Sequence, residues 1–141
     1  MNRSMLRYII GRILIIFSLL LLVPAVVALI YREGARVFLS FFGVALLSGG
    51  LGFVFGREKP TNTKFYAKEG LVICALSWIL FSVLGGLPMV LAGDVADMVD
   101  ATFEAASGFT TTGSSILANV DIVSRATVFW RSFSHLVGGM G

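Results

Sequence analysis

The chain has 141 residues, of which 57% are hydrophobic and only 13% are charged, and its net charge is +3. Its mean hydropathy is +0.91, whereas a soluble domain carries about 25% charged residues. The composition therefore excludes an ordinary soluble domain and predicts contact with a lipid bilayer. The basic residues form short clusters rather than a stripe on a soluble face, which excludes a nucleic-acid partner. The single cysteine excludes a disulfide framework or a thiolate metal site within one chain.

Three apolar blocks, residues 13–30, 37–55 and 71–92, are long enough to cross a membrane, since about 20 apolar residues suffice. A fourth begins near residue 128 and stops at residue 141. Arginines precede the first block, as in a signal peptide, but the block is too long and no clear cleavage site follows it. We therefore expect a retained helix and an all-α, multi-pass membrane protein.

The distribution of Lys and Arg predicts the orientation. The N-terminus and the loop after the second block carry seven basic residues, against two, Arg32 and Arg36, in the turn after the first block. Positive charge is retained on the cytoplasmic side of a membrane. The N-terminus is therefore expected in the cytoplasm, and the third block then delivers Asp94 to the external face.

The segment that follows Asp94 predicts a short helix over residues 97–108. Asp97 is a suitable N-cap, Asp100 complements the positive end of the helix, and Gly108 marks a natural end. A helix of about 12 residues is roughly 18 Å long, which reaches only the middle of a hydrocarbon layer about 30 Å thick. This length is typical of a re-entrant pore helix, whose negative C-terminal end would favour a cation.

Four residues after this helix predict an ion pathway: Thr110, Thr111, Thr112 and Gly113. Irregular backbone is tolerated at membrane depth only where it is buried in protein or lines a watery cavity. Hydroxyl and carbonyl oxygens can replace the water of an ion, and without fixed charge they suit a monovalent ion that must also leave. Gly113 permits backbone geometry closed to other residues.

Carboxylates near this loop have two interpretations each. Glu104, inside the expected pore helix, either sets the electric field near the loop or supports the helix through hydrogen bonds to backbone amides, because an intramembrane carboxylate is costly unless paired. Asp94, Asp97 and Asp100 either concentrate cations at the outer mouth or belong to a solvated loop and a helix cap.

The string Ala101-Thr-Phe-Glu-Ala-Ala-Ser-Gly-Phe-Thr-Thr-Thr-Gly-Ser resembles the first pore loop of the Trk/Ktr/HKT potassium-transporter superfamily, in particular its bacterial Trk-H type. Residues 129–132 and 138–141 resemble the start of the next helix of that family, and residues 57–88 resemble the preceding one. Residues 13–55 fit the additional N-terminal hairpin of the Trk-H branch.

The resemblance implies potassium uptake across the bacterial inner membrane. It implies that K⁺ is held by Thr110, Thr111, Thr112 and Gly113 as a selectivity filter, with Glu104 and Gly108 in the supporting pore helix. A glycine at the position of Gly113 is associated with potassium passage in the superfamily, and a serine with sodium preference. The expected parts are a transmembrane hairpin (1–56), a cytoplasmic basic loop (57–68) and a first pore repeat (69–141) with outer helix 69–92, pore helix 97–108, filter 110–113 and inner helix from about 127.

Members of the superfamily build the pore from four such repeats in one chain, usually paired as a homodimer and gated by a cytoplasmic nucleotide-binding subunit. One repeat cannot close a ring of four filter segments. We therefore expect a fragment of a longer protein, whose partners are the remaining repeats, a second copy and that regulatory subunit. No cofactor is expected in this chain, and K⁺ enters as the transported ion.

A small accessory membrane protein is the alternative function. Its glycine-rich helices would bind partner helices, and it would have no pore of its own. The Ser-Gly-Phe-Thr-Thr-Thr-Gly string distinguishes the two, since an accessory protein has no physical need for it. An enzyme is not expected, because the chain has one histidine, His135, and no nucleophile–base pair.

Overall fold

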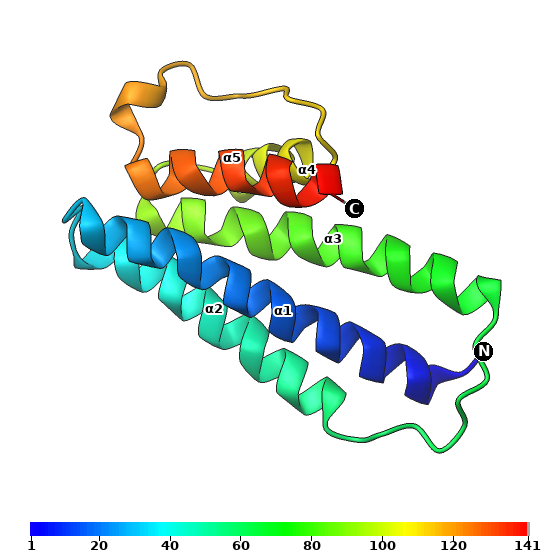
Figure 1. The fold of residues 1–141 in the computed structure, drawn as a ribbon. Helices are drawn as coiled ribbons and strands as arrows, with labels where there is room; N and C mark the ends of the chain where they lie inside the picture. The colour runs from blue at the N-terminus through cyan, green and yellow to red at the C-terminus, as the bar shows by residue number, and fades with distance from the viewer. Residues whose placement is uncertain (141) are drawn as a thin grey trace.

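The computed structural model describes residues 1–140, and within that range every regular element is a helix. The order is α1 (Arg3–Ile30), α2 (Ala35–Gly56), α3 (Ala67–Ala92), α4 (Met98–Phe109), the short 3-10 helix η1 (Val120–Ile122) and α5 (Arg125–Met140) (Figure 1). Three of them, α1, α2 and α3, are long and apolar enough to cross a membrane. The expected all-α membrane fold is confirmed. Gly141, which the sequence assigns to the inner helix, lies outside the described residues.

Four helix ends differ from the expected ones by one or two residues, among them the start of α4, which is Met98 rather than 97. Helix α3 begins at Ala67 rather than 69, α4 continues past Gly108 to Phe109, and α5 begins at Arg125 rather than 127. In α3 the Glu69 carboxylate accepts a hydrogen bond from the Tyr66 backbone N (3.2 Å), which stabilises an earlier start. In α4 Gly108 lies inside the last turn, packed closely against α5.

Helices α1 and α2 form a closely packed antiparallel hairpin (Figure 1). A Cβ atom on Gly11 would lie 2.3 Å from the Gly56 backbone N, and one on Gly52 would lie 2.7 Å from the Gly11 carbonyl oxygen. Small residues let two backbones approach in this way, which is how helices commonly associate in membranes. The hairpin is therefore a tightly packed unit whose outward apolar side chains can face lipid.

One aromatic cluster joins all five α-helices. Trp130 of α5 is fully buried and has its ring centroid 5.8 Å from Phe17 of α1, 6.4 Å from Phe41 of α2 and 5.8 Å from Phe109 of α4. Phe17 stacks on Phe81 of α3 at 4.8 Å. Each such aromatic pair contributes about 0.5–1.5 kcal/mol beyond its buried area. The cluster packs the hairpin, α3 and the α4–α5 layer into one body.

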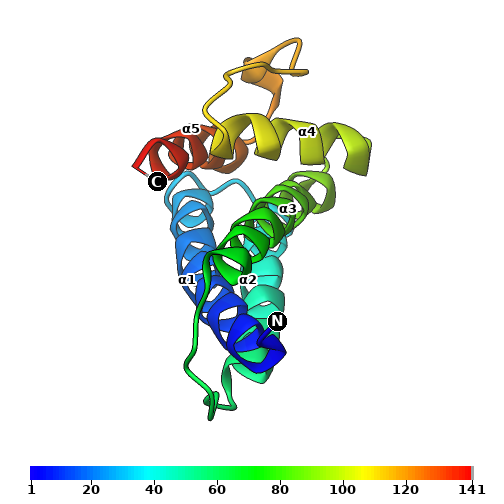
Figure 2. The same cartoon turned by 90° about the vertical axis from the view of Figure 1, so that its right-hand side faces the viewer.

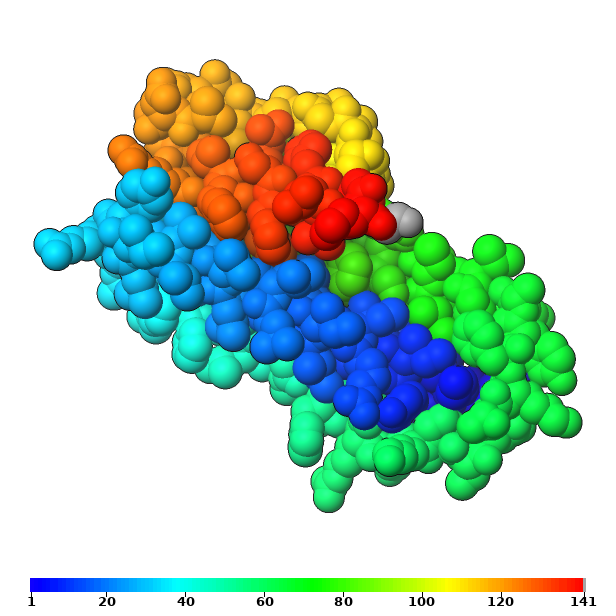
Figure 3. Space-filling model, viewed as in Figure 1, coloured from blue at the N-terminus to red at the C-terminus, as the bar shows by residue number. Residues whose placement is uncertain are grey.

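The chain folds so that its connections gather at two opposite ends. The α1–α2 turn, the end of α3 and the start of α5 meet at one end, while the N-terminus and the start of α3 lie at the other (Figure 1). Helices α4 and α5 lie together across one end of the α1–α3 layer (Figure 2), and α5 lies against α1 on the face seen in Figure 3.

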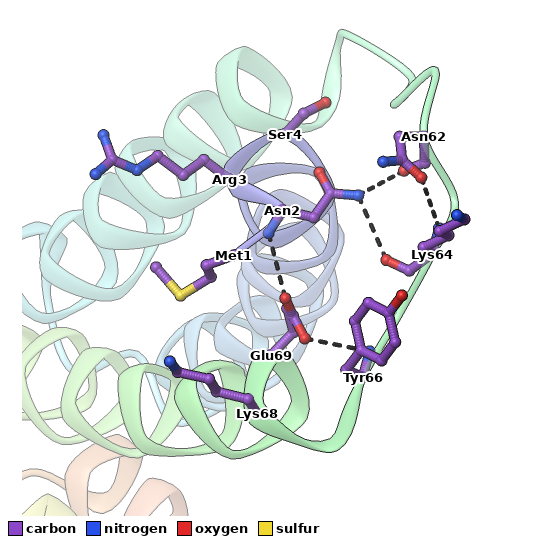
Figure 4. A pocket seen from close by; sticks show the side chains of 9 residues that line it. All are labelled: Met1, Asn2, Arg3, Ser4, Asn62, Lys64, Tyr66, Lys68 and Glu69. Carbon is purple, nitrogen blue, oxygen red and sulfur yellow. Dashed lines mark hydrogen bonds between the residues drawn. The ribbon is translucent and has the colours of Figure 1, made fainter.

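The N-terminal end is held by hydrogen bonds around an open hollow of about 690 Å³ (Figure 4). The Asn2 backbone N donates to Glu69 Oε1 (3.2 Å), and Asn2 Nδ2 donates to the Asn62 carbonyl (2.6 Å). These bonds tie the first residues of α1 to the 57–66 linker and to α3. The basic residues of the N-terminus and of the 57–68 segment therefore lie toward one end of the molecule, whereas Arg32 and Arg36 lie at the other.

Candidate functional site

Helix α4 is short, and the Thr-Thr-Thr-Gly segment follows directly at its C-terminal end. Its N-cap is Asp97, whose side chain accepts a hydrogen bond from the Val99 backbone N (3.3 Å), and it has 12 residues. At 1.5 Å per residue it is about 18 Å long. A helix of this length cannot cross a membrane, so the chain must turn back after Phe109.

The backbone donors of the turn are used by α4. Thr110 N donates to the Ala106 carbonyl (2.9 Å), Thr111 N to the Gly108 carbonyl (3.0 Å) and Thr112 N to the Ser107 carbonyl (3.0 Å). Within residues 1–140, no donor reaches the carbonyl oxygens of Thr111, Thr112 or Gly113, and the segment is exposed. A backbone polar group needs a partner. The carbonyl oxygens of residues 111–113 are therefore exposed acceptors that no group among the described residues uses.

Two residues of the turn have left-handed backbone geometry. Thr111 has φ +56° and Gly113 has φ +80°. For a β-branched residue such as Thr111 this geometry is rare and costs about 1–3 kcal/mol, whereas glycine adopts it freely. Space does not restrict position 113, because a Cβ there would meet nothing within 4 Å. Backbone conformation, rather than packing, is the reason that glycine fits at 113.

The threonine hydroxyls bond within the turn. Thr110 Oγ1 donates to the Ala106 carbonyl (2.7 Å) and lies 2.8 Å from Thr112 Oγ1, so the Thr112 hydroxyl is the donor of that pair. Thr111 Oγ1 donates to the Thr110 carbonyl (2.7 Å). Their hydroxyls thus brace the turn, and the free acceptors are the carbonyl oxygens.

Glu104 holds the chain that leaves the turn. It is fully buried in α4, its Oε1 accepts from Ser115 Oγ (2.9 Å), and its Oε2 accepts from the Ile116 backbone N (3.0 Å). A parallel contact runs from Ser107 Oγ to the Ser114 carbonyl (2.6 Å). Residues 110–113 are therefore fixed on both sides, by the end of α4 before them and by these bonds after them. Between the two interpretations of Glu104, this geometry favours support through hydrogen bonds.

Arg131 of α5 forms an ion pair with the Glu104 carboxylate. The Arg131 side chain is 22% exposed and that of Glu104 is 0% exposed. The pair satisfies the requirement that an intramembrane charge be compensated. The ion pair with Arg131 was not predicted from the sequence. Glu104 itself was the available signal, because a buried carboxylate requires a compensating cation. Arg125 and Arg131 are the two arginines that follow it in the sequence.

Small residues let α5 approach the turn. A Cβ on Gly138 would lie 2.0 Å from the Phe109 carbonyl oxygen, and one on Gly108 would lie 2.1 Å from Ser134 Oγ. Gly108 is therefore a packing position of α4, not its end. The turn lies beside the C-terminal part of α5, near Gly139, where a Cβ would be 3.8 Å from Thr111 Cγ2.

The three outer aspartates have different surroundings. Asp94 accepts hydrogen bonds from Ser124 N (3.0 Å), Ser124 Oγ (2.5 Å) and Thr127 Oγ1 (2.5 Å), so both of its oxygens are engaged. Asp97 caps α4 and Asp100 lies exposed in its first turn. Asp97 is therefore a helix cap, and Asp94 holds Ser124, whose Oγ accepts from the Thr127 backbone N in the first turn of α5. Of the three, Asp100 is exposed and has no capping role among the described residues.

The part of the chain that the structure describes contains no group of three or more His, Cys, Asp or Glu side chains arranged for a metal ion. His135 Nδ1 lies 2.8 Å from the Arg131 carbonyl of its own helix. This contact lies within α5 and does not join His135 to a neighbouring helix. The oxygen acceptors that remain unused in this region are the backbone carbonyls of residues 111–113.

Comparisons with known proteins agree with this arrangement. The family model TrkH, described as a cation transport protein, matches residues 33–141. The Trk system potassium uptake protein TrkH of Vibrio parahaemolyticus is 37% identical over 141 residues, covering 99% of this chain and 28% of that protein. An uncharacterised cation transporter of Methanocaldococcus jannaschii is 37% identical over 135 residues, covering 95% of this chain and 28% of that protein.

The crystal structure of the potassium transporter TrkH from Vibrio parahaemolyticus superposes with a TM-score of 0.90 and 31% identity, over 100% of this chain and 30% of that one. The chain thus spans a little under a third of the length of these relatives, which are named as transporters. Family match, sequence identity and shared fold lead to one conclusion: this chain belongs to the TrkH family of cation transport proteins.

Proposed function

We propose that this chain supplies one filter segment of a potassium-conducting pore, made by Thr110, Thr111, Thr112 and Gly113. The observation that carries the proposal is the unused carbonyl oxygens of residues 111–113 at the end of a helix too short to cross a membrane. Neutral carbonyl oxygens replace the hydration shell of K⁺ and still let the ion leave. The negative C-terminal end of α4 adds a favourable field for a cation.

We further propose that the chain consists of three parts. Residues 1–56 are a transmembrane hairpin, residues 57–68 a cytoplasmic loop, and residues 69–141 one pore repeat with its filter at 110–113. The grouping of basic residues at the N-terminal end supports a cytoplasmic N-terminus in a bacterial inner membrane.

A single filter segment does not enclose an ion, so the proposed pore needs further segments. The resemblance supports three further repeats, a homodimer and a cytoplasmic nucleotide-binding regulatory subunit as partners, with K⁺ as cargo and no cofactor in this chain. The accessory-protein alternative gives no reason for the strained φ of Thr111 or for a carbonyl-presenting turn.

Potassium-limited growth tests the function. A bacterial strain without its own potassium uptake systems would express either these 141 residues or the gene's complete reading frame. Rescue by the complete frame alone would support a pore built from several segments. Rescue by the 141 residues would mean that copies of this chain assemble into the pore. The absence of rescue by either, with both present in the membrane, would reject potassium uptake.

A further inference from the structure

The turn of the N-terminal hairpin caps a helix of the pore repeat. Glu33 lies between α1 and α2, and its carboxylate accepts hydrogen bonds from the backbone N of Arg125 and of Ala126, the latter at 3.0 Å. These are the first residues of α5, whose N–H groups have no partner within the helix. A carboxylate there also complements the positive end of the helix. The contact joins residues more than 90 positions apart in the chain.

Other contacts fix the same end of α5. Asp94, just after α3, accepts from Ser124 and Thr127, and the Arg125 guanidinium lies 4.6 Å from the ring centroid of Tyr31 in the hairpin turn. Arg36 Nε, at the start of α2, donates to the Leu91 carbonyl near the end of α3 (3.0 Å). The hairpin, α3 and α5 are therefore bound to one another at this end of the molecule.

Helix α5 in turn holds the chain that leaves the filter. Arg131 lies six residues after Arg125, which is about 9 Å along the helix axis. It pairs with Glu104, and Glu104 binds Ser115 and the Ile116 backbone N. Contiguous packed and hydrogen-bonded contacts of this kind can carry energetic coupling between sites. A change at Glu33 that shifts α5 would therefore displace Arg131 and the far side of the 110–113 turn.

We propose that Glu33 is a positioning residue for the filter, and that the N-terminal hairpin sets filter geometry through α5. This inference rests on the proposed function. It gives the hairpin a role in ion selection that membrane anchoring alone does not require. The hairpin acts at the end of the molecule opposite to the N-terminus, through the Glu33 carboxylate and the Arg131–Glu104 pair.

The test measures the potassium-to-sodium permeability ratio of Glu33→Gln in the complete reading frame, by cation uptake in proteoliposomes. The ratio is independent of how much protein reaches the membrane. We expect it to fall about threefold or more, since coupling through such networks corresponds to roughly 2- to 30-fold. Glu33→Asp keeps the charge on a shorter side chain, so it should also lower the ratio, but by a smaller factor. Glu58→Gln is the matched control, because Glu58 is an exposed residue near the opposite end, 3.4 Å from Arg7.

The route through α5 is tested by combining Glu33→Gln with Ser115→Ala, which removes the hydroxyl contact with Glu104. Non-additive effects on the ratio are expected if both substitutions act on one network. A wild-type ratio in Glu33→Gln would overturn the proposal, even if less protein were present. If Glu33→Gln yields no protein, a wild-type ratio in Glu33→Asp would overturn it and a lowered ratio would support it. Loss of potassium uptake by the unsubstituted protein would instead refute the proposed function.

Discussion

Replacing Glu104 by glutamine should destabilise the protein strongly, although the two side chains have the same shape. The Glu104 carboxylate is fully buried and pairs with Arg131, whose side chain is 22% exposed. Removing one partner of a buried ion pair leaves the other charge uncompensated and costs about 3–5 kcal/mol. Because Arg131 is partly exposed, we expect the lower part of this range. The glutamine amide can also accept only through one oxygen, so Ser115 Oγ and the Ile116 N lose one of their two acceptors.

The free energy of unfolding in detergent would be measured for Glu104→Gln, Arg131→Met and the double variant. We expect a coupling energy within roughly 0.5–3 kcal/mol, as found for residues in contact. The exposed pair Arg7–Glu58 provides the matched control, since such surface pairs contribute about 0–1 kcal/mol. The buried pair would be refuted as the support of the turn if the two substitutions had additive effects. It would also be refuted if their coupling energy were smaller than that of the Arg7–Glu58 pair.

Three further outcomes are expected. Gly113→Ser should lower the potassium-to-sodium permeability ratio, because serine at φ +80° strains the turn by about 1–2 kcal/mol; an unchanged ratio would argue strongly against a filter role. Gly86→Ala should lower the melting temperature, because its Cβ would lie 2.6 Å from the Ala101 backbone and overpacking costs about 1–3 kcal/mol. Gly43→Ala is the control: its Cβ would meet nothing within 4 Å, so the melting temperature should stay the same. Trp130→Phe should cost at least about 1 kcal/mol in chemical unfolding, because it removes the hydrogen bond from Trp130 Nε1 to the Gly85 carbonyl (2.9 Å) and leaves a gap at a fully buried position; equal stability would contradict a stabilising role for this bond.

The long helices were predictable from sequence because hydropathy over about 20 residues depends on composition alone. Blocks 13–30, 37–55 and 71–92 all lie inside helices α1, α2 and α3. The short α4 was also predictable, because Asp97 supplies a cap that local sequence reveals. Its end was misplaced by one residue, since Gly108 is required by the close approach of α5 and not by a left-handed C-cap.

The contacts of the candidate site could not be predicted in the same way. The pairing of Glu104 with Arg131, and of Glu33 with the start of α5, joins residues far apart in the chain whose proximity depends on helix packing. The left-handed φ of Thr111 contradicts local preference, because a β-branched residue avoids that region. Such conflicts between local preference and structure are expected at functional sites.

Three carboxylates bear on which ion the proposed filter would select: Glu104, which binds the chain after the turn, and Glu33 and Asp94, which lie at the start of α5. Glu33 caps α5, both oxygens of Asp94 bind Ser124 and Thr127, and Glu104 is neutralised by Arg131. None of these three is left to coordinate a cation at residues 110–113. Divalent ions such as Ca²⁺ are held by carboxylate-rich sites, whereas uncharged carbonyl oxygens suit a monovalent ion that binds weakly and leaves. We therefore expect the proposed filter to prefer monovalent over divalent cations.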